Sequence, residues 1–87
     1  MTYEEFKAFV CKEGDRRATH GGLVPIPELR LRVPLDRETF DEYVWHLHAE
    51  QVIHLLSHVD GQKLPEPVRT DCIVHSSGAL LYWMRWL

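Results

Sequence analysis

One segment, residues 34–57 with the sequence PLDRETFDEYVWHLHAEQVIHLLS, changes its hydrophobic period once and thereby constrains the fold most strongly. Its first part carries apolar residues at the spacing of one helical face, namely Phe40, Tyr43, Val44 and Leu47. Asp36 suits the N-cap, since its carboxylate can accept hydrogen bonds from the N–H groups of the first turn. Leu35, just before it, can pack against Phe40 as a hydrophobic staple. After Gln51, the apolar run 52–56 is typical of a strand. The segment therefore predicts a capped helix that leads directly into a strand.

A first helix is predicted near the N-terminus. Thr2 and Glu5 have the spacing of a capping box, in which side chain and backbone bond reciprocally. One apolar face follows, with Phe6, Phe9 and Val10. The helix is expected to end near Gly14, or one turn later, before a break at residues 19–22.

A short strand and a short helix are predicted next. Residues 23–26 are apolar and extended, but Pro25 cannot donate to a ladder, so this is at best an edge strand. Pro27 suits the first position of a helix over residues 28–33, and Pro34 ends that helix. The order helix, strand, helix, tight turn and long helix is that of a helix-turn-helix.

The C-terminal part predicts a long loop and a final strand. A loop as long as residues 57–78 is usually functional or partly structured, and residues 66–71 can form one irregular turn in it. Residues 79–87 are predicted to return beside the strand 52–56. Alternation divides the final strand into one face with Leu80, Tyr82, Met84 and Trp86 and a second face with Leu81, Trp83, Arg85 and Leu87.

Both faces of this final strand are apolar apart from Arg85, whereas a small sheet buries only one face on its helices. Two explanations are open. The long loop 57–78 can fold back over the second face, or another chain can cover it. Because the strand is expected at a sheet edge, it can also pair its backbone with a partner, as a homodimer or with another protein.

This order of elements resembles the winged helix-turn-helix superfamily, which has three helices, a short strand before the second helix, and a two-stranded wing after the third. The resemblance implies an α+β, winged helix-like fold over residues 1–87 as a single domain, with three helices, a small antiparallel C-terminal sheet and a long wing loop at 57–78. It also implies that the third helix binds DNA or that the same surface binds proteins.

Length and composition fit one small domain without a membrane span. The chain has 87 residues, and no apolar run approaches the ~20 residues that a membrane helix needs. Cys11 and Cys72 are expected to be free thiols in a reducing cytoplasm, so a cytoplasmic location is predicted.

The third predicted helix is acidic where a DNA-reading helix is usually basic. Residues 36–50 carry one Lys or Arg against five Asp or Glu. The helical angle directs Glu38, Glu42 and Trp45 away from the core. This face is interpreted as a solvated acidic surface or a protein contact, since tryptophan is enriched at binding hot spots. Direct reading of DNA is the least favoured interpretation, because carboxylates repel phosphates.

A nucleic-acid alternative rests on four arginines of the first two helices: Arg16, Arg17, Arg30 and Arg32. Together they can contact a phosphate backbone. Acidic residues at Glu13, Asp15 and Glu28 interleave with them, so ordinary surface ion pairs are the favoured interpretation.

Metal binding and catalysis are not predicted. Cys72-x-x-His75 has ligand spacing, but His46 and His48 point ~200° apart on a helix, and His54 and His58 lie ~13 Å apart on a strand. Paired Cys-x-x-Cys knuckles, nucleophile elbows and phosphate loops are absent from the sequence. We expect no metal, no cofactor and no enzymatic activity.

The sequence thus predicts a small non-catalytic binding module for protein–protein interaction or self-association, with a DNA-binding regulator as the alternative. The expected partner-binding residues are Glu38, Glu42, Trp45, Trp83 and Trp86. The expected core comprises Phe6, Phe9, Val10, Leu29, Val33, Phe40, Tyr43, Val44, Leu47, Ile53 and Leu55.

Overall fold

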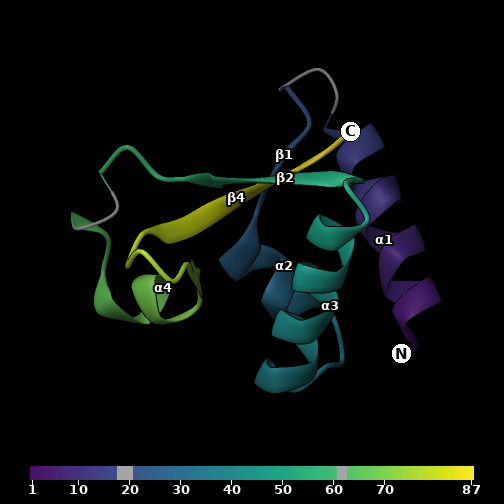
Figure 1. Ribbon diagram of the computed structural model, residues 1–87, viewed down its shortest axis with the longest axis horizontal. Helices are drawn as coiled ribbons and strands as arrows, with labels where there is room; N and C mark the ends of the chain where they lie inside the picture. The colour runs from purple at the N-terminus through teal and green to yellow at the C-terminus, as the bar shows by residue number, and fades with distance from the viewer. Residues whose placement is uncertain (18–20, 61–62) are drawn as a thin grey trace.

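The structure, a computed structural model, describes residues 1–17, 21–60 and 63–87. Over these residues the order is α1 (Tyr3–Arg16), β1 (Leu23–Pro25), α2 (Ile26–Arg32), α3 (Arg37–Ala49), β2 (Ile53–Ser57), α4 (Glu66–Thr70), β3 (Ile73–Val74) and β4 (Leu80–Trp86). The described chain is therefore α+β with an antiparallel sheet, which confirms the predicted class. Figure 1 shows α2, α3 and α4 on one side of the sheet and α1 beside α3.

The two long helices begin as predicted. The Thr2 N–H donates to Glu5 Oε1 at 2.9 Å, and the Glu5 N–H donates to Thr2 Oγ1 at 3.2 Å, which completes the capping box of α1. The Asp36 carboxylate accepts from the Thr39 N–H at 3.4 Å and caps α3. These local pairs fix where each helix starts, independently of the remaining chain.

The last strand, β4, lies in the centre of the sheet. The described strands run in the order β1-β4-β2, and β3 also pairs with β4. The expectation that the final strand forms an edge is therefore wrong, because β1 occupies its other side at Leu23–Pro25. Backbone pairing with another chain is not open to β4 where β1 and β2 flank it.

A bulge in β4 changes which residues face the helices. Leu56 pairs with Trp83, but Ser57 pairs with Leu81, so Tyr82 is an extra residue in the ladder. Because of this extra residue, Leu81 and Met84 are both buried, at 9% and 0% exposed. The predicted strict alternation, which placed Leu81 on the face opposite to Met84, is wrong at this point.

The core lies between the helices and one face of the sheet. Eight of the expected core residues are buried, namely Phe6, Val10, Leu29, Val33, Phe40, Val44, Leu47 and Ile53. The other three, Phe9, Tyr43 and Leu55, are partly buried and pack against the same cluster. The sequence did not single out six further buried residues, Val24, Ile26, Cys72, Ile73, Leu81 and Met84.

The segment expected as a loop contains α4 and β3, so the described chain has four helices where three were predicted. The Arg37 guanidinium bonds to the Asp71 carboxylate at 2.7 Å, and Arg30 Nε donates to the Asp71 carbonyl at 3.0 Å. These bonds attach the end of α4 to α2 and α3. Residues 61–62, and residues 19–20 of the predicted break, lie outside the described parts of the chain.

The described part of this segment folds back onto the helical side, where Cys72 and Ile73 join the buried residues. On the opposite face of the sheet, His58 of this segment stacks its ring against Trp83, with centroids 6.3 Å apart, and no helix of the described chain covers that face (Figure 1). Of the two explanations for the second apolar face, cover by the long loop is seen among the described residues at His58 beside Trp83, whereas Leu56 of the same row is still 39% exposed.

Candidate functional site

The face of the sheet that points away from the helices, here called the outer face, is built from two rows of cross-strand neighbours. The strand register gives the first row as Pro25, Trp83 and Leu56 and the second row as Leu23, Arg85 and His54. Between the rows, Val24 and Met84 point into the core and are 2% and 0% exposed. Strand alternation therefore assigns both rows to the opposite side.

Trp83 lies at the centre of the first row and is held by aromatic neighbours. The Tyr82 ring meets it edge-on, with centroids 4.6 Å apart, and the His58 ring is stacked at 6.3 Å. Trp83 is partly buried, yet it does not pack against the core cluster. The half-buried state of Trp83 thus comes from neighbours outside the core cluster, among them Tyr82 and His58.

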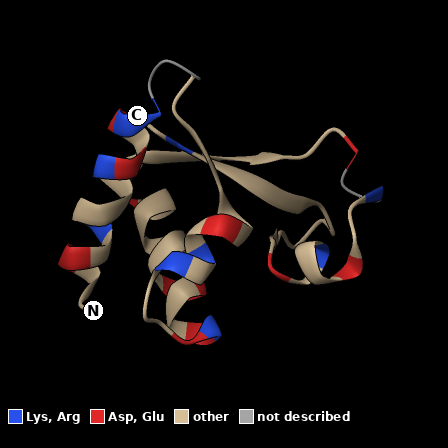
Figure 2. Ribbon diagram, turned by 180° about the vertical axis from the view of Figure 1, so that it is seen from behind, with Lys and Arg blue, Asp and Glu red and all other residues tan. Residues whose placement is uncertain are grey.

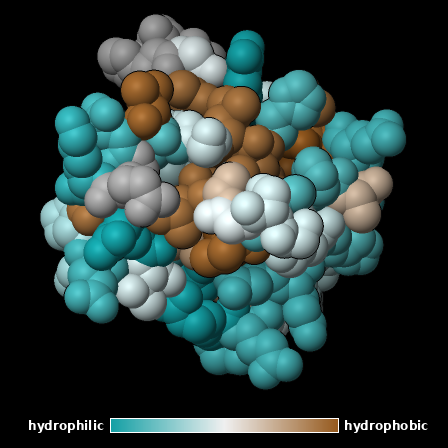
Figure 3. Space-filling model, turned by 60° about the vertical axis from the view of Figure 1, so that its left-hand side comes forward, coloured by the Kyte–Doolittle hydropathy of each residue, from teal (hydrophilic) through white to brown (hydrophobic). Residues whose placement is uncertain are grey.

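The three strands that form this face are almost free of charge. Across β1, β2 and β4, Arg85 is the single Lys, Arg, Asp or Glu, whereas the helices carry both signs (Figure 2). In the view of Figure 3, hydrophobic residues gather near the middle of the surface, with hydrophilic residues around them. Exposed apolar residues of β2, β3 and the chain between them are Leu56, Val59 and Val74.

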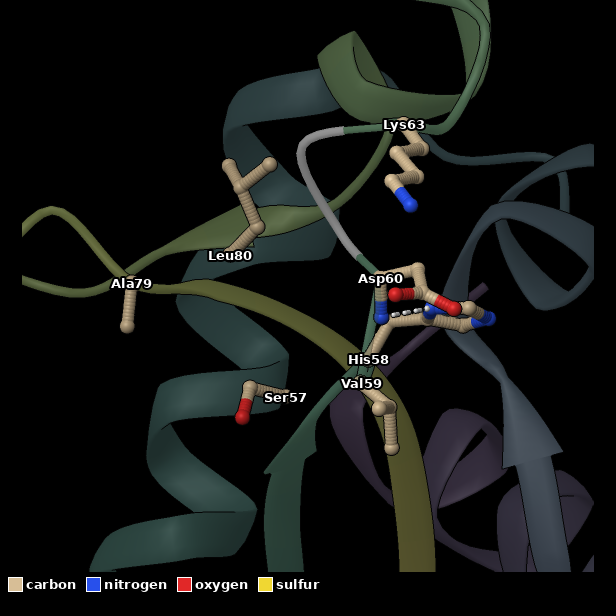
Figure 4. Close-up of a pocket in the computed structure, with 7 residues that line it drawn as sticks. All are labelled: Ser57, His58, Val59, Asp60, Lys63, Ala79 and Leu80. Carbon is tan, nitrogen blue, oxygen red and sulfur yellow. Dashed lines mark hydrogen bonds between the residues drawn. The ribbon is translucent and has the colours of Figure 1, made fainter.

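A hollow of about 300 Å³ borders the outer face beyond His58 (Figure 4). Its lining comprises Ser57, His58, Val59, Asp60, Lys63, Ala79 and Leu80. The Asp60 N–H donates to His58 Nδ1 at 3.0 Å, which fixes the ring beside Trp83. Figure 4 shows the Ser57 side chain directed away from the His58 ring, so the hollow contains no serine–histidine pair of the kind used for nucleophilic catalysis.

The expected residues of α3 lie elsewhere, on the helical side. Glu38 and Glu42 are exposed, as predicted. Trp45 is partly buried and packs against the core, with its ring 5.7 Å from His48 and 6.4 Å from His75. Trp45 therefore fills the space between α3 and the segment that follows β3, rather than projecting from α3.

The expected pair Trp83 and Trp86 lie on opposite sides of β4. Trp86 packs against the core, and its Cβ is 2.9 Å from the position that a Cβ on Gly14 of α1 would occupy. The five expected partner-binding residues are thus not brought together, and only Trp83 belongs to the outer face.

The four arginines of the nucleic-acid alternative all have carboxylate partners. Arg30 pairs with Asp41 at 2.9 Å, and Arg17 pairs with Glu28. Arg16 and Arg32 both bond to the Glu13 carboxylate, each at 2.8 Å. Because each positive charge is compensated locally, these residues form ion pairs between α1, α2 and α3 rather than a free basic surface.

Glu13 is the centre of one such cluster. It is 6% exposed and accepts from Arg32 and Arg16, with Arg17 Nε at 3.6 Å. The Arg32 hydrogen bond, with that from Arg16, outweighs burial and lowers the pKa of Glu13 to about 2. The carboxylate is therefore charged in the folded protein and joins the end of α1 to α2.

The candidate metal ligands of the chain are its histidines and cysteines. Within the described residues, no three His, Cys, Asp or Glu side chains are placed to hold a metal ion. Cys11 and Cys72 are both free, and burial raises the pKa of the Cys72 thiol. The Cys72 Sγ donates to the Val68 carbonyl at 3.4 Å, which is a structural role.

The sequence did not indicate Leu23, Pro25, Leu56 or Tyr82 as site residues. Each lies in or beside an apolar run, but which side of the sheet it occupies depends on the strand order and on the bulge at Tyr82. The sequence did offer one indication: three apolar strands with a single charged residue, Arg85, cannot direct all of their side chains into one small core.

Comparisons with known proteins do not place the chain in a family. No protein-family model matches it, and neither a curated protein nor a solved structure matches it significantly. Separately, none of the helices in the described residues has both the length and the apolarity needed to cross a membrane.

Proposed function

We propose that this chain is a non-catalytic, winged helix-like module that binds another protein through the outer face of its sheet. One observation carries the proposal: Trp83 lies at the centre of an apolar row, on a sheet with a single charged residue, and no described helix covers it. An apolar face with a held aromatic residue and a polar margin is typical of a protein-interaction site.

The winged helix-like part of the proposal is supported by the order of elements. The strands run β1-β4-β2, with α2 and α3 between β1 and β2, and α3 leads directly into β2. The order of the elements along the chain is the one that the sequence resemblance implies, whereas the central place of β4 was not expected from it. The additional helix α4 and strand β3 lie between the two strands of the corresponding wing.

A DNA-binding role has less support. The exposed side of α3 presents Glu38 and Glu42, and phosphates would be repelled by these carboxylates. The arginines that favoured the alternative are paired with Glu13, Glu28 and Asp41. Binding to DNA would require these ion pairs to be broken, at an energetic cost that protein binding through the outer face avoids.

The proposal is tested by comparing the wild-type protein with Trp83→Glu and with the matched control Leu31→Glu. Leu31 is 82% exposed on α2, away from the outer face, so its substitution adds the same charge to an apolar position elsewhere. Proteins captured from a cell extract by the wild type and the control, but not by Trp83→Glu, are identified, purified and titrated by calorimetry.

We expect Trp83→Glu to weaken the purified complex by about 30-fold or more, as at a binding hot spot, with an unchanged circular dichroism spectrum. Equal affinity of wild type and Trp83→Glu for every purified partner would refute the outer face as the binding site. Binding to random duplex DNA that weakens steeply with salt, and that survives Trp83→Glu, would instead support the nucleic-acid alternative.

A further inference from the structure

Arg85 is the charged residue of the outer face, and its guanidinium has no partner in the described chain. It lies between Leu23 and His54 in the second row. None of the ion pairs or hydrogen bonds of the described residues involves its side chain, in contrast to five other arginines. An uncompensated guanidinium beside an apolar row is suited to a carboxylate from another molecule, which it can bind bidentately.

A hollow of about 320 Å³ opens beside Arg85 and gives a ligand room there. It is lined by Gly14, Asp15, Gly21, Gly22, Arg85, Trp86 and Leu87. Asp15 contributes a negative charge to the same hollow, but no ion pair joins it to Arg85. Among the described residues, none therefore forms an ion pair with the Arg85 guanidinium.

We propose that the outer face binds an acidic, apolar peptide segment of a different protein, with an apolar side chain on the Trp83 row and a carboxylate on Arg85. This inference rests on the proposed function and names the class of partner. The rows are two residues apart along β4, about 6.6 Å, which matches alternate residues of an extended peptide or one turn of a helix.

A second copy of this chain fits the face less well. The two rows of the outer face contain no carboxylate, so two copies joined row to row would place no acid of the rows opposite Arg85. The acids at the margin, Asp15 and Asp60, line the two hollows beside the face rather than its rows. The exposed acids Glu38 and Glu42 lie on α3, on the helical side. If Glu38 or Glu42 of one copy bound Arg85 of another, the contact would join α3 to an outer face. Such a contact between unlike surfaces produces an open-ended chain of copies rather than a closed dimer.

The test uses a phage-displayed library of short random peptides, selected separately on the wild-type protein, Arg85→Glu, Trp83→Ala and the control Lys12→Glu. Lys12 is an exposed cation on α1, so Lys12→Glu changes the net charge by the same amount as Arg85→Glu. We expect the wild type and the control to enrich peptides with Asp or Glu about two to four positions from an aromatic or aliphatic residue. Arg85→Glu should enrich Lys or Arg instead, and Trp83→Ala should lose the enrichment.

A selected peptide is then synthesised with its acidic residue and with the corresponding amide. By fluorescence anisotropy, the amide should bind the wild type about tenfold more weakly, whereas Arg85→Gln should not distinguish the two peptides. Arg85→Gln provides a neutral variant in case the charge reversal disturbs folding, which circular dichroism would show.

Three outcomes would overturn the inference. Trp83-dependent peptides without an acidic preference would refute it and leave the proposed function standing. An acidic preference that persists in both Arg85 variants would place the carboxylate elsewhere. Failure to enrich any peptide would also refute it, while the purified-partner titration with Trp83→Glu would still decide the proposed function independently.

Discussion

At the scale of single residues, Phe40 is the centre of the core. Its ring is fully buried, 5.6 Å from the Phe6 ring and 4.4 Å beneath the Arg30 guanidinium. Phe40→Ala removes these contacts and leaves a cavity, so we expect the free energy of unfolding in urea to fall by about 3–5 kcal/mol. The control Glu42→Ala, exposed on the same helix, should change it by less than about 0.5 kcal/mol. A loss below about 1 kcal/mol for Phe40→Ala would contradict its central position.

Gln51 adopts a left-handed backbone conformation, with φ of 63°, at the end of α3. The Val52 N–H donates to the Leu47 carbonyl and the Gln51 N–H to the His48 carbonyl, which is the Schellman pattern that usually places glycine here. Gln51→Gly should therefore raise the free energy of unfolding by about 0.5–1 kcal/mol in urea titrations. A decrease would show that the Gln51 side chain contributes more than the backbone strain costs.

At the scale of elements, α1 and β4 approach most closely at Gly14. An alanine in a helix is normally about 1 kcal/mol more favourable than glycine. Here the added Cβ would lie 2.9 Å from the Trp86 Cβ, so the helix must shift away from the strand. We expect Gly14→Ala to lower the free energy of unfolding by about 1–2 kcal/mol, measured in urea, with Lys12→Ala as the surface control on α1. An increase in stability would contradict this close packing.

The ion pairs by which Glu13 joins α1 to α2 depend on pH, because they require its charged carboxylate. Its pKa is about 2 in the folded protein, because of the Arg32 and Arg16 hydrogen bonds, and near 4.5 when unfolded. A lowered folded pKa stabilises the protein fully above pH 4.5, and this stabilisation is lost as the pH falls from there towards 2. Glu13→Gln should thus be less stable than the wild type at pH 7, with a difference that narrows in urea titrations below pH 4.5. A difference independent of pH would refute this role.

At the scale of the whole molecule, the segment between β2 and β4 belongs to the core rather than forming a separate loop. Ile73 is 2% exposed and pairs with Leu81, and Asp71 bonds to Arg37. Ile73→Ala should lower the stability of the entire chain by about 2–4 kcal/mol and keep a single unfolding transition by fluorescence and circular dichroism. The matched control Val74→Ala, at a residue that is 60% exposed, should cost far less. Two separate transitions would show that this segment folds by itself.

The arrangement of the whole molecule also explains why one apolar face stays open. The helices cover one side of a sheet in which β4 is central, and both sides of β4 carry large apolar residues. In a chain of 87 residues, the available helices bury the Met84 side, and no described helix covers the Trp83 side. The proposed binding site is thus the part of the apolar surface that the chain does not bury by itself.

The sequence alone determined the features that depend on neighbours within one or two helical turns. The capping box of Thr2 and Glu5, the cap at Asp36 and the buried stripe of α3 follow from local spacing, and the structure confirms them. The central place of β4, the bulge at Tyr82 and the burial of Ile73 depend on pairings between residues far apart in the chain. Periodicity placed Trp83 and Arg85 on one face of the final strand, but it does not identify a strand's neighbours. Only the tertiary structure placed Pro25, Leu56, Leu23 and His54 beside them.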